Sequence, residues 1–419
     1  MYWKCLPQRS IWRTFRHLLV TLVLYYLTFF VVLPIFCKDL PFSYYYSRTE
    51  RLDENVRQAM NWNEQRLHKE ESHLRSLDAE KTFQEYGETK ENIHIAVGIV
   101  TVSRVYNTYD GTNPKYLTQV VSRVHRSIKK HRRGHKNVVF ICNVNSPSQD
   151  HAEAMELATY FPVVHKYGTT NVRLTKEWMP SLVFHKEQED YLFCLNFSRK
   201  YDAKYVVLLQ DDAMPHDDFY AKLLYILENR VEMRYSRGEL VANTEKWSWL
   251  KMNFPTPSAG FFSNWLFTIE GVALSLIPAS ITALIYDICY RQSNRISLCF
   301  TYYIFIISFV YFGATAASIG RPFFLPYLYS SVHLSAIRPG TSCCIAAVVY
   351  PSASLSQIVD YLADVDCRAW YPLDFCLYDF LETSGMKQYL AVPNIFTHIG
   401  MVSSLHNRAV VFPAFHAPL

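Results

Sequence analysis

Asp211 and Asp212 are the residues of this 419-residue sequence whose types and spacing most clearly suggest chemistry. They directly follow the apolar, β-branched run 203–209, which is typical of a buried strand. Two carboxylates at a strand end repel each other unless a cation neutralises them, and their hard oxygen atoms suit Mg²⁺ or Mn²⁺. A solvated acidic turn is the alternative, because aspartate is common in turns and Met214-Pro215 follows.

Strands and helices alternate around this acidic pair. We expect strands at residues 93–102, 137–144, 161–167 and 203–209, with helices at 116–131 and 180–200 between them. Such alternation predicts an α/β fold with a mostly parallel sheet. Ligands of these sheets bind beyond the carboxyl ends of the strands, which is where the two aspartates would lie.

Glycine is scarce, at 13 residues, and none of them forms a glycine-rich phosphate loop. The spacing excludes the Rossmann and Walker fingerprints and the nucleophile elbow of the α/β-hydrolases. The net charge of +5 is small and the basic residues are scattered, which argues against a nucleic-acid partner. A divalent metal held by carboxylates can also bind a diphosphate. Without a glycine-rich loop, this is the favoured way for the chain to bind such a ligand.

Three long stretches are almost free of charge, and they cover residues 18–36, 265–286 and 296–320. Each is long enough for a transmembrane helix. A buried core helix is the alternative for each, most seriously for the second stretch, which contains Glu270. We expect a transmembrane anchor at residues 18–37 and a transmembrane hairpin at 263–320, with the lipid bilayer as a partner.

The charges beside these stretches predict their orientation. Residues 1–17 contain basic residues and no acidic ones, which indicates a cytosolic tail and a retained signal anchor rather than a cleaved signal peptide. Residues 38–258 and 321–419 would then share the lumenal side as one soluble body that the hairpin interrupts. Residues 38–91, which are polar with apolar residues at helical spacing, are expected to form a helical stem.

The cysteines suit an oxidising compartment, because the expected lumenal pieces hold an even number of them. They are Cys142, Cys194, Cys343, Cys344, Cys367 and Cys376. Their pairing cannot be deduced from the sequence. Asn196 begins a glycosylation sequon inside an expected helix, and its use is left open.

The helix, strand and acidic motif together resemble the core of the GT-A glycosyltransferases, in particular the branch that includes the N-acetylglucosaminyltransferases IV. The segments concerned are 187–197, 205–209 and Gln210-Asp211-Asp212, with 116–122 similar to the first helix and 396–400 and 403–405 similar to the closing segment. A signal anchor plus a hairpin within such a domain resembles a family of Golgi enzymes that modify GPI anchors. This likeness covers residues 18 to about 405 and implies a GT-A-type sheet with flanking helices.

The resemblance implies an inverting, metal-dependent transferase in the Golgi membrane. Its donor would be UDP-GalNAc, its metal Mn²⁺ or Mg²⁺, and its acceptor the mannose of the GPI glycan on GPI-anchored proteins. An N-glycan-branching N-acetylglucosaminyltransferase is one alternative, although it would not need the hairpin. A catalytically impaired membrane scaffold is another, because the family's motif begins with glutamate and this chain has the uncharged Gln210.

The resemblance also assigns roles to individual residues. Donor contacts would come from Thr101, Ser103, Arg104, Gln210 and Asp211, and metal ligands from Asp211, Asp212 and His398. The alternatives are a solvated surface role for Arg104 and a structural role for His398.

Inversion requires a general base that deprotonates the acceptor hydroxyl. The segment 370–380 is expected to start a helix near Pro372, which puts Asp374 in the first turn and Asp379 in the second. We predict Asp374 as the base, with Asp379 as the second candidate. The alternative is that Asp374 only stabilises the start of the helix, where acidic residues are favoured.

Overall fold

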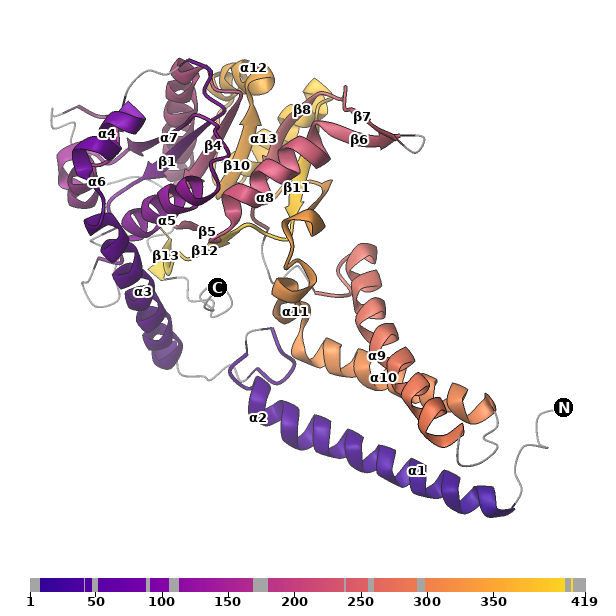
Figure 1. Cartoon of the computed structure of the whole chain (residues 1–419). Helices are drawn as coiled ribbons and strands as arrows, with labels where there is room; N and C mark the ends of the chain where they lie inside the picture. The colour runs from indigo at the N-terminus through magenta and orange to yellow at the C-terminus, as the bar shows by residue number, and fades with distance from the viewer. Residues whose placement is uncertain are drawn as a thin grey trace. The chain divides into compact units, whose positions relative to one another are not determined.

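The computed structural model describes residues 8–40, 42–46, 52–87, 91–104, 113–168, 180–236, 239–254, 260–291, 298–403 and 408–409. The chain forms two compact units, each built from two separate pieces of sequence (Figure 1). A helical unit comprises residues 1–51 and 255–328. An α/β unit comprises residues 52–254 and 329–419.

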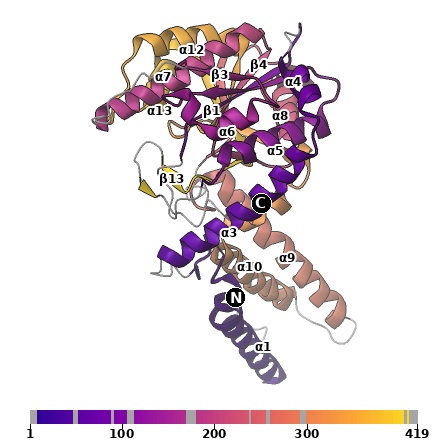
Figure 2. The same cartoon turned by 90° about the vertical axis from the view of Figure 1, so that its left-hand side faces the viewer.

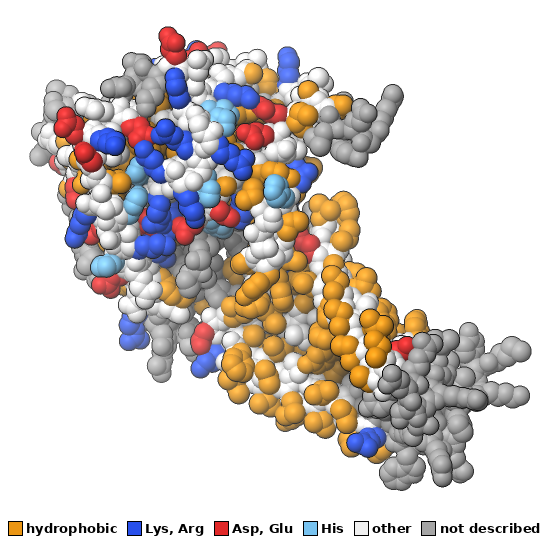
Figure 3. All heavy atoms as spheres, in the orientation of Figure 1, with side chains coloured by type: hydrophobic (Ala, Val, Ile, Leu, Met, Phe, Trp, Pro, Cys, Tyr) orange, Lys and Arg blue, Asp and Glu red, His pale blue; other side chains and the backbone are white. Residues whose placement is uncertain are grey.

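The helical unit contains three apolar segments that are long enough to cross a membrane: Leu18–Cys37, Trp265–Cys289 and Phe300–Ile319. The first belongs to a continuous helix of α1 (Gln8–Leu27), a π-helical turn (Thr28–Val32) and α2 (Leu33–Cys37). The other two belong to the paired helices α9 (Trp265–Arg291) and α10 (Leu298–Ile319), which α11 (Arg321–Leu328) follows. Hydrophobic side chains cover the visible face of this unit in Figure 3. The predicted apolar anchor helix and helical hairpin are thus confirmed.

Glu270, the acidic residue within α9, forms an ion pair with Arg321 at the start of α11. Its two carboxylate oxygens accept from Arg321 Nε at 2.7 Å and from Nη2 at 3.0 Å. The guanidinium also lies 3.5 Å from the centroid of the Phe267 ring. The charge of Glu270 is therefore paired within the helical unit, by the buried Arg321 that follows the hairpin.

The α/β unit is built on an eight-stranded sheet in the order β3-β2-β1-β4-β10-β8-β11-β9. The first four, β3, β2, β1 and β4, run parallel, β10 is antiparallel to both β4 and β8, β11 is parallel to β8, and β9 is antiparallel to β11. The predicted mostly parallel α/β sheet is confirmed. The strands are β1 (Ile95–Thr101), β2 (Asn137–Asn143), β3 (Val163–His165), β4 (Tyr205–Gln210), β8 (Trp247–Lys251), β9 (Ala336–Pro339), β10 (Ala347–Pro351) and β11 (Lys387–Val392).

Helices cover both faces of this sheet (Figure 2). One core lies beneath α5 (Tyr116–His131) and α8 (Phe219–Ile226). The other lies beneath α7 (Pro180–Ser198), α12 (Ser352–Asp364) and α13 (Leu373–Ser384). Strand β1 contributes side chains to both cores, because successive residues of a strand point to opposite faces of the sheet. Ile95, Val97 and Ile99 belong to the first core and Ala96 to the second. Shorter elements are α6 (Ala152–Leu157), β5 (Ala213–Pro215), β6 (Met233–Ser236), β7 (Glu239–Ala242), β12 (Phe396–His398), β13 (Val402–Ser403) and β14 (Arg408–Ala409).

Disulfides pair all six cysteines that the sequence assigns to an oxidising compartment. The pairs are Cys142–Cys194, Cys343–Cys344 and Cys367–Cys376. The first ties β2 to α7, next to Gly98 of β1. A Cβ at Gly98 would lie 2.7 Å from the Phe140 ring and 3.2 Å from the Cys194 sulfur, so the close packing of α7 on the sheet requires glycine there.

The expected helical segment before the sheet is present as α3 (Leu52–Arg75) and α4 (Ala79–Gly87). Helix α3 packs on α5, and Glu70 of α3 is fully buried at this contact. Its Oε1 accepts from Arg123 Nε at 2.7 Å and from Arg126 Nη2 at 2.9 Å, and its Oε2 accepts from Ser122 at 3.0 Å. A buried charge with three partners fixes where α3 docks.

We predict that Glu70→Ala lowers the free energy of unfolding of the α/β unit by about 3–5 kcal/mol, because it leaves two arginines without their buried counter-ion. Thermal or denaturant unfolding of the full chain in detergent measures this loss. Glu80→Ala, on the exposed surface of α4, is the matched control and is expected to change stability by less than about 0.5 kcal/mol. Equal effects of the two substitutions would contradict the role of Glu70.

Candidate active site

The predicted acidic pair lies at the carboxyl edge of the sheet, directly after β4. Asp211 N–H donates to Val100 O of the neighbouring β1 at 3.1 Å, so the pair is held between the ends of two parallel strands. Both aspartates are only 4% exposed. They are therefore not part of a solvated acidic turn.

Arg104 joins the two carboxylates. Its Nη2 forms a close ion pair with Asp211 Oδ1 and lies 3.0 Å from Asp212 Oδ2. The Arg104 side chain is 9% exposed, and its guanidinium lies 5.5 Å from the centre of the Tyr116 ring. Burial lowers the pKa of Arg104, but the two carboxylates outweigh it and raise this pKa above its ordinary value. Arg104 thus supplies the positive charge that lets both aspartates be buried.

Thr101, at the end of β1, fixes the other side of Asp211. Its hydroxyl donates to Asp211 Oδ2 at 2.9 Å and lies 2.8 Å from His151 Nε2. Because the hydroxyl proton goes to the carboxylate, His151 is the donor to the Thr101 oxygen. Burial lowers the pKa of His151 to about 4, which keeps this histidine neutral. Both oxygens of Asp211 are thus engaged by protein donors.

His398 reaches the pair from the second piece of the α/β unit. Strand β12 pairs antiparallel with β5, and His398 is opposite Ala213. Its Nε2 lies 3.4 Å from Asp212 Oδ2. A Cβ on Gly400 would lie 2.3 Å from the same Asp212 oxygen, so the closing segment needs glycine to approach the carboxylate.

One oxygen of the pair is left for a ligand. Among the residues that the structure describes, Asp212 Oδ1 is buried and has no hydrogen-bond partner. Burial raises the pKa of Asp212, but Arg104 and His398 outweigh it and hold this pKa below its ordinary value. The described ranges contain no group of three or more His, Cys, Asp or Glu side chains arranged around a metal position. Asp212 Oδ1 and the neighbouring imidazole of His398 have the donor chemistry that divalent cations accept.

The remaining predicted donor contacts lie at the same edge. The N–H of Ser103 donates to Asn145 Oδ1 at 3.3 Å, which ties the segment after β1 to the loop after β2. Gln210 ends β4, and its N–H donates to Ala346 O at 2.9 Å. Its half-buried side chain is an uncharged amide, so this position adds no charge to those of the two aspartates.

Asp374 contacts the segment that precedes β10, at this same edge of the sheet. Strand β10 starts beside the end of β4, so the residues before it lie at the carboxyl edge. In that segment the N–H of Cys344 donates to Asp374 Oδ2 at 3.4 Å. Asp374 Oδ1 also accepts from Phe375 N at 3.1 Å, within the first turn of α13. Asp379 instead accepts from the Tyr371 hydroxyl, so it anchors the loop before α13.

Lys251, which sequence reasoning missed, holds the segment that contacts Asp374. Its Nζ donates to the carbonyl oxygens of Thr341, Ser342 and Cys343 at 2.7, 3.1 and 2.9 Å. Burial lowers the pKa of Lys251 to about 8. Its position at the end of β8 is the signal that could have indicated it.

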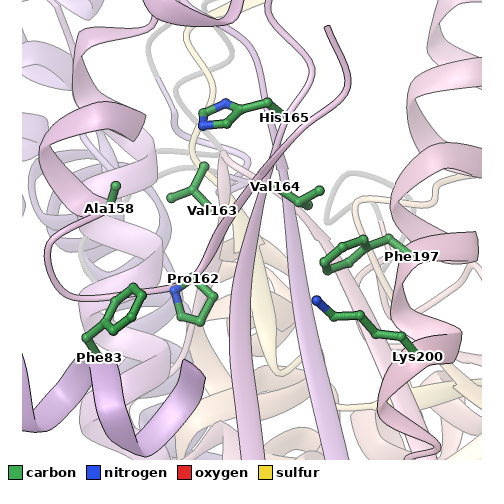
Figure 4. Close-up of a pocket in the computed structure, with 8 residues that line it drawn as sticks. All are labelled: Phe83, Ala158, Pro162, Val163, Val164, His165, Phe197 and Lys200. Carbon is green, nitrogen blue, oxygen red and sulfur yellow. The ribbon is translucent and has the colours of Figure 1, made fainter. Parts of the chain in front are cut away.

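His151 and Glu153 were also missed, although they follow β2 and could have been placed at the same edge by that position. Glu153 is 7% exposed, and its Oε1 accepts from Thr118 N at 2.7 Å, in the first turn of α5. Burial raises the pKa of Glu153 to about 7. The pocket in Figure 4, about 320 Å³ in volume, lies elsewhere along β3 and is lined by none of these residues.

We predict that Glu153 makes the protein less stable as the pH rises. Its pKa is about 7 in the folded chain and near 4.5 in the unfolded chain, so the folded state holds an extra proton between these values. The resulting stabilisation is complete below pH 4.5 and is lost as the pH rises through 7. Unfolding of wild type and Glu153→Gln between pH 5 and 8 tests this, and the variant should show the smaller decline. An equal decline in both would contradict it.

A family model described as the GPI-N-acetylgalactosamine transferase PGAP4 matches residues 95–397. The matched range begins at β1, includes the acidic pair, the apolar hairpin and Asp374, and ends one residue before His398. The match covers well over half of the sequence. The chain belongs to this family of glycosyltransferases, which transfer N-acetylgalactosamine to the GPI glycan.

Proposed function

We propose that the chain moves N-acetylgalactosamine from UDP-GalNAc to a mannose of the GPI glycan, with inversion, between Asp212 and Asp374. The observation that carries this proposal is the connection of the two carboxylates across adjacent strands. Asp212 follows β4, whose last residue bonds to Ala346, and Cys344 in the same segment bonds to Asp374. One sheet edge therefore holds both the buried aspartate pair, proposed for the donor, and a carboxylate proposed for the acceptor.

The donor's diphosphate is proposed to bind beside Asp212. Asp212 Oδ1 and His398 would hold Mn²⁺ or Mg²⁺, which when bound would neutralise the diphosphate and stabilise the charge on the departing UDP. Asp211, which the sequence also suggests as a ligand, already accepts from Arg104 and Thr101 and would orient the arginine. Thr101, Ser103 and Gln210 would lie along the nucleotide.

Asp374 is proposed as the general base. The acceptor hydroxyl attacks the anomeric carbon on the face opposite UDP, and its proton passes to the Asp374 carboxylate as the new bond forms. The bond between the anomeric carbon and the UDP oxygen breaks in the same step, and UDP leaves with its electron pair. The Cys344 N–H donates to Oδ2 and so orients the carboxylate.

The membrane arrangement predicted from the charge pattern suits this acceptor. We propose that the chain resides in the Golgi membrane, with residues 18–37 as anchor, 263–320 as hairpin, and both pieces of the α/β unit in the lumen. The three apolar helices support a membrane location by their length and composition. GPI-anchored proteins in the same membrane would be the acceptors.

We predict that Asp212→Ala lowers GalNAc transfer by roughly a hundredfold or more, since it removes the proposed cation ligand. Membranes containing the chain are given UDP-GalNAc and Mn²⁺, and the GPI glycan is examined by mass spectrometry. EDTA should abolish transfer by wild type, and added Mn²⁺ should restore it. Asp150→Ala, exposed at the same edge, is the control and should transfer normally.

Equal transfer by wild type and Asp212→Ala would contradict the proposed metal site. Absence of transfer by wild type under all conditions would favour the impaired scaffold, for which Gln210 is the supporting feature.

We predict that Asp374→Asn lowers kcat by about 10²–10⁴-fold, the usual contribution of a general base. The amide keeps the shape and the contact with Cys344 but cannot take the acceptor proton, so KM for UDP-GalNAc should stay near its wild-type value. Asp379→Asn is the matched variant and should retain most of kcat, because Asp379 accepts from Tyr371. The reverse ranking of the two variants would assign the base to Asp379 instead.

A further inference from the structure

The loop that leads into Asp374 is closed and braced. The Cys367–Cys376 disulfide joins its two ends. Within it, Arg368 and Tyr371 exchange two backbone hydrogen bonds, at 2.8 and 2.9 Å. Trp370 lies between these two residues, at the tip of the turn.

The base of this loop is fixed to α7 and α13. Gln188 of α7 accepts from the N–H of Cys367 at 2.8 Å and donates to Leu362 O at 2.7 Å. The Tyr371 hydroxyl donates to Asp379 of α13. The loop is therefore ordered by its own contacts before any ligand binds, which lowers the entropy cost of binding to it.

Trp370 is nevertheless 78% exposed, and Phe375, which follows Asp374, is 49% exposed. Trp249 of β8, by contrast, is 1% exposed. The Trp370 ring contacts the Tyr371 ring, with centroids 6.1 Å apart, but most of its surface faces water. Binding residues are often carried on ordered loops of this kind. Trp370 precedes Asp374, which we propose as the base, by four residues, and Phe375 directly follows it.

We propose that Trp370 and Phe375 form a stacking platform for a hexose of the acceptor glycan, beside Asp374. A pyranose ring has an apolar C–H face and a rim of hydroxyls, so it can lie on an aromatic ring while its hydroxyls remain free for hydrogen bonds. A sugar stacked there would have a hydroxyl beside Asp374. The stacking contact itself is apolar, so the platform needs no charged residue. The inference rests on the proposed function, because it takes Asp374 as the base.

A membrane surface is the other class of partner that an exposed tryptophan suits. The glycan is favoured because the closed loop carries Trp370 and Asp374 together, between Cys367 and Cys376. An experiment can distinguish the glycan from the membrane, because a lipid-free glycan would bind to a sugar platform but not to a membrane-contact site.

The test measures binding of a lipid-free GPI glycan fragment to the full chain in detergent, with UDP present, by titration calorimetry. We expect Trp370→Ala to weaken the Kd by about tenfold or more and Trp370→Phe to weaken it by less, since phenylalanine retains a smaller ring. Phe83→Ala, a partly exposed aromatic on α4 that lines the pocket along β3, is the control and should bind as wild type does. Thermal unfolding checks that each variant is folded.

An unchanged Kd in Trp370→Ala would overturn the proposal. So would an effect seen only with the lipid-linked acceptor, which would identify Trp370 as a membrane contact. Binding is measured without turnover, so the test of the stacking platform is independent of the test of the proposed function. Glycan binding that depends on Trp370 without any transfer would count against the proposed function, and transfer with an unchanged Kd would count against the platform.

Discussion

The guanidinium of Arg104 allows two adjacent carboxylates to be buried at the end of β4. An unpaired buried carboxylate costs several kcal/mol, and two side by side also repel each other. One cation within reach of both removes much of that cost and holds them in one arrangement. The parallel pairing of β1 with β4 brings Arg104 to the acidic pair, because Thr101 ends β1 and Asp211 directly follows the end of the neighbouring β4. The Arg104 guanidinium also lies against the ring of Tyr116 in α5. The Tyr116 hydroxyl in turn accepts a hydrogen bond from the N–H of Met401 in the closing segment.

The two pieces of the α/β unit meet in the middle of the sheet. Strand β10, from the second piece, inserts between β4 and β8 of the first, with Val348 opposite both Leu208 and Lys251. The inserted piece of residues 255–328, which contains the apolar hairpin, can thus interrupt the sequence of this unit without interrupting its sheet. Because β10 begins at the carboxyl edge, the segment before it brings Cys344 into contact with Asp374 at the edge that also holds the acidic pair.

The sequence predicts the first half of this arrangement well. The β-branched runs of β1, β2 and β4 are continuous and end in polar residues, so both the parallel strands and the edge position of Asp211 follow from hydrophobic pattern alone. The bridging role of Arg104 does not, because an arginine is usually exposed and its partner depends on strand order. His398 was named through the resemblance of its segment, and the geometry at Gly400 now gives that motif a physical reason.

Other parts depend on long-range pairing that no local pattern carries. Residues 247–251 were not predicted as a strand, yet β8 is internal to the sheet, and its Lys251 holds the segment beside Asp374. The disulfide partners and the burial of Glu70 under α5 depend equally on distant contacts.

The proposed function depends most on one arrangement: the edge bridged by Arg104 binds the donor and faces Asp374. A cryo-EM structure of the full chain with UDP and Mn²⁺ tests it most directly. We predict the diphosphate beside Asp212 and His398, with Asp374 across the sugar site. A nucleotide bound away from Asp212, or on the side of the α/β unit remote from Asp374, would contradict it.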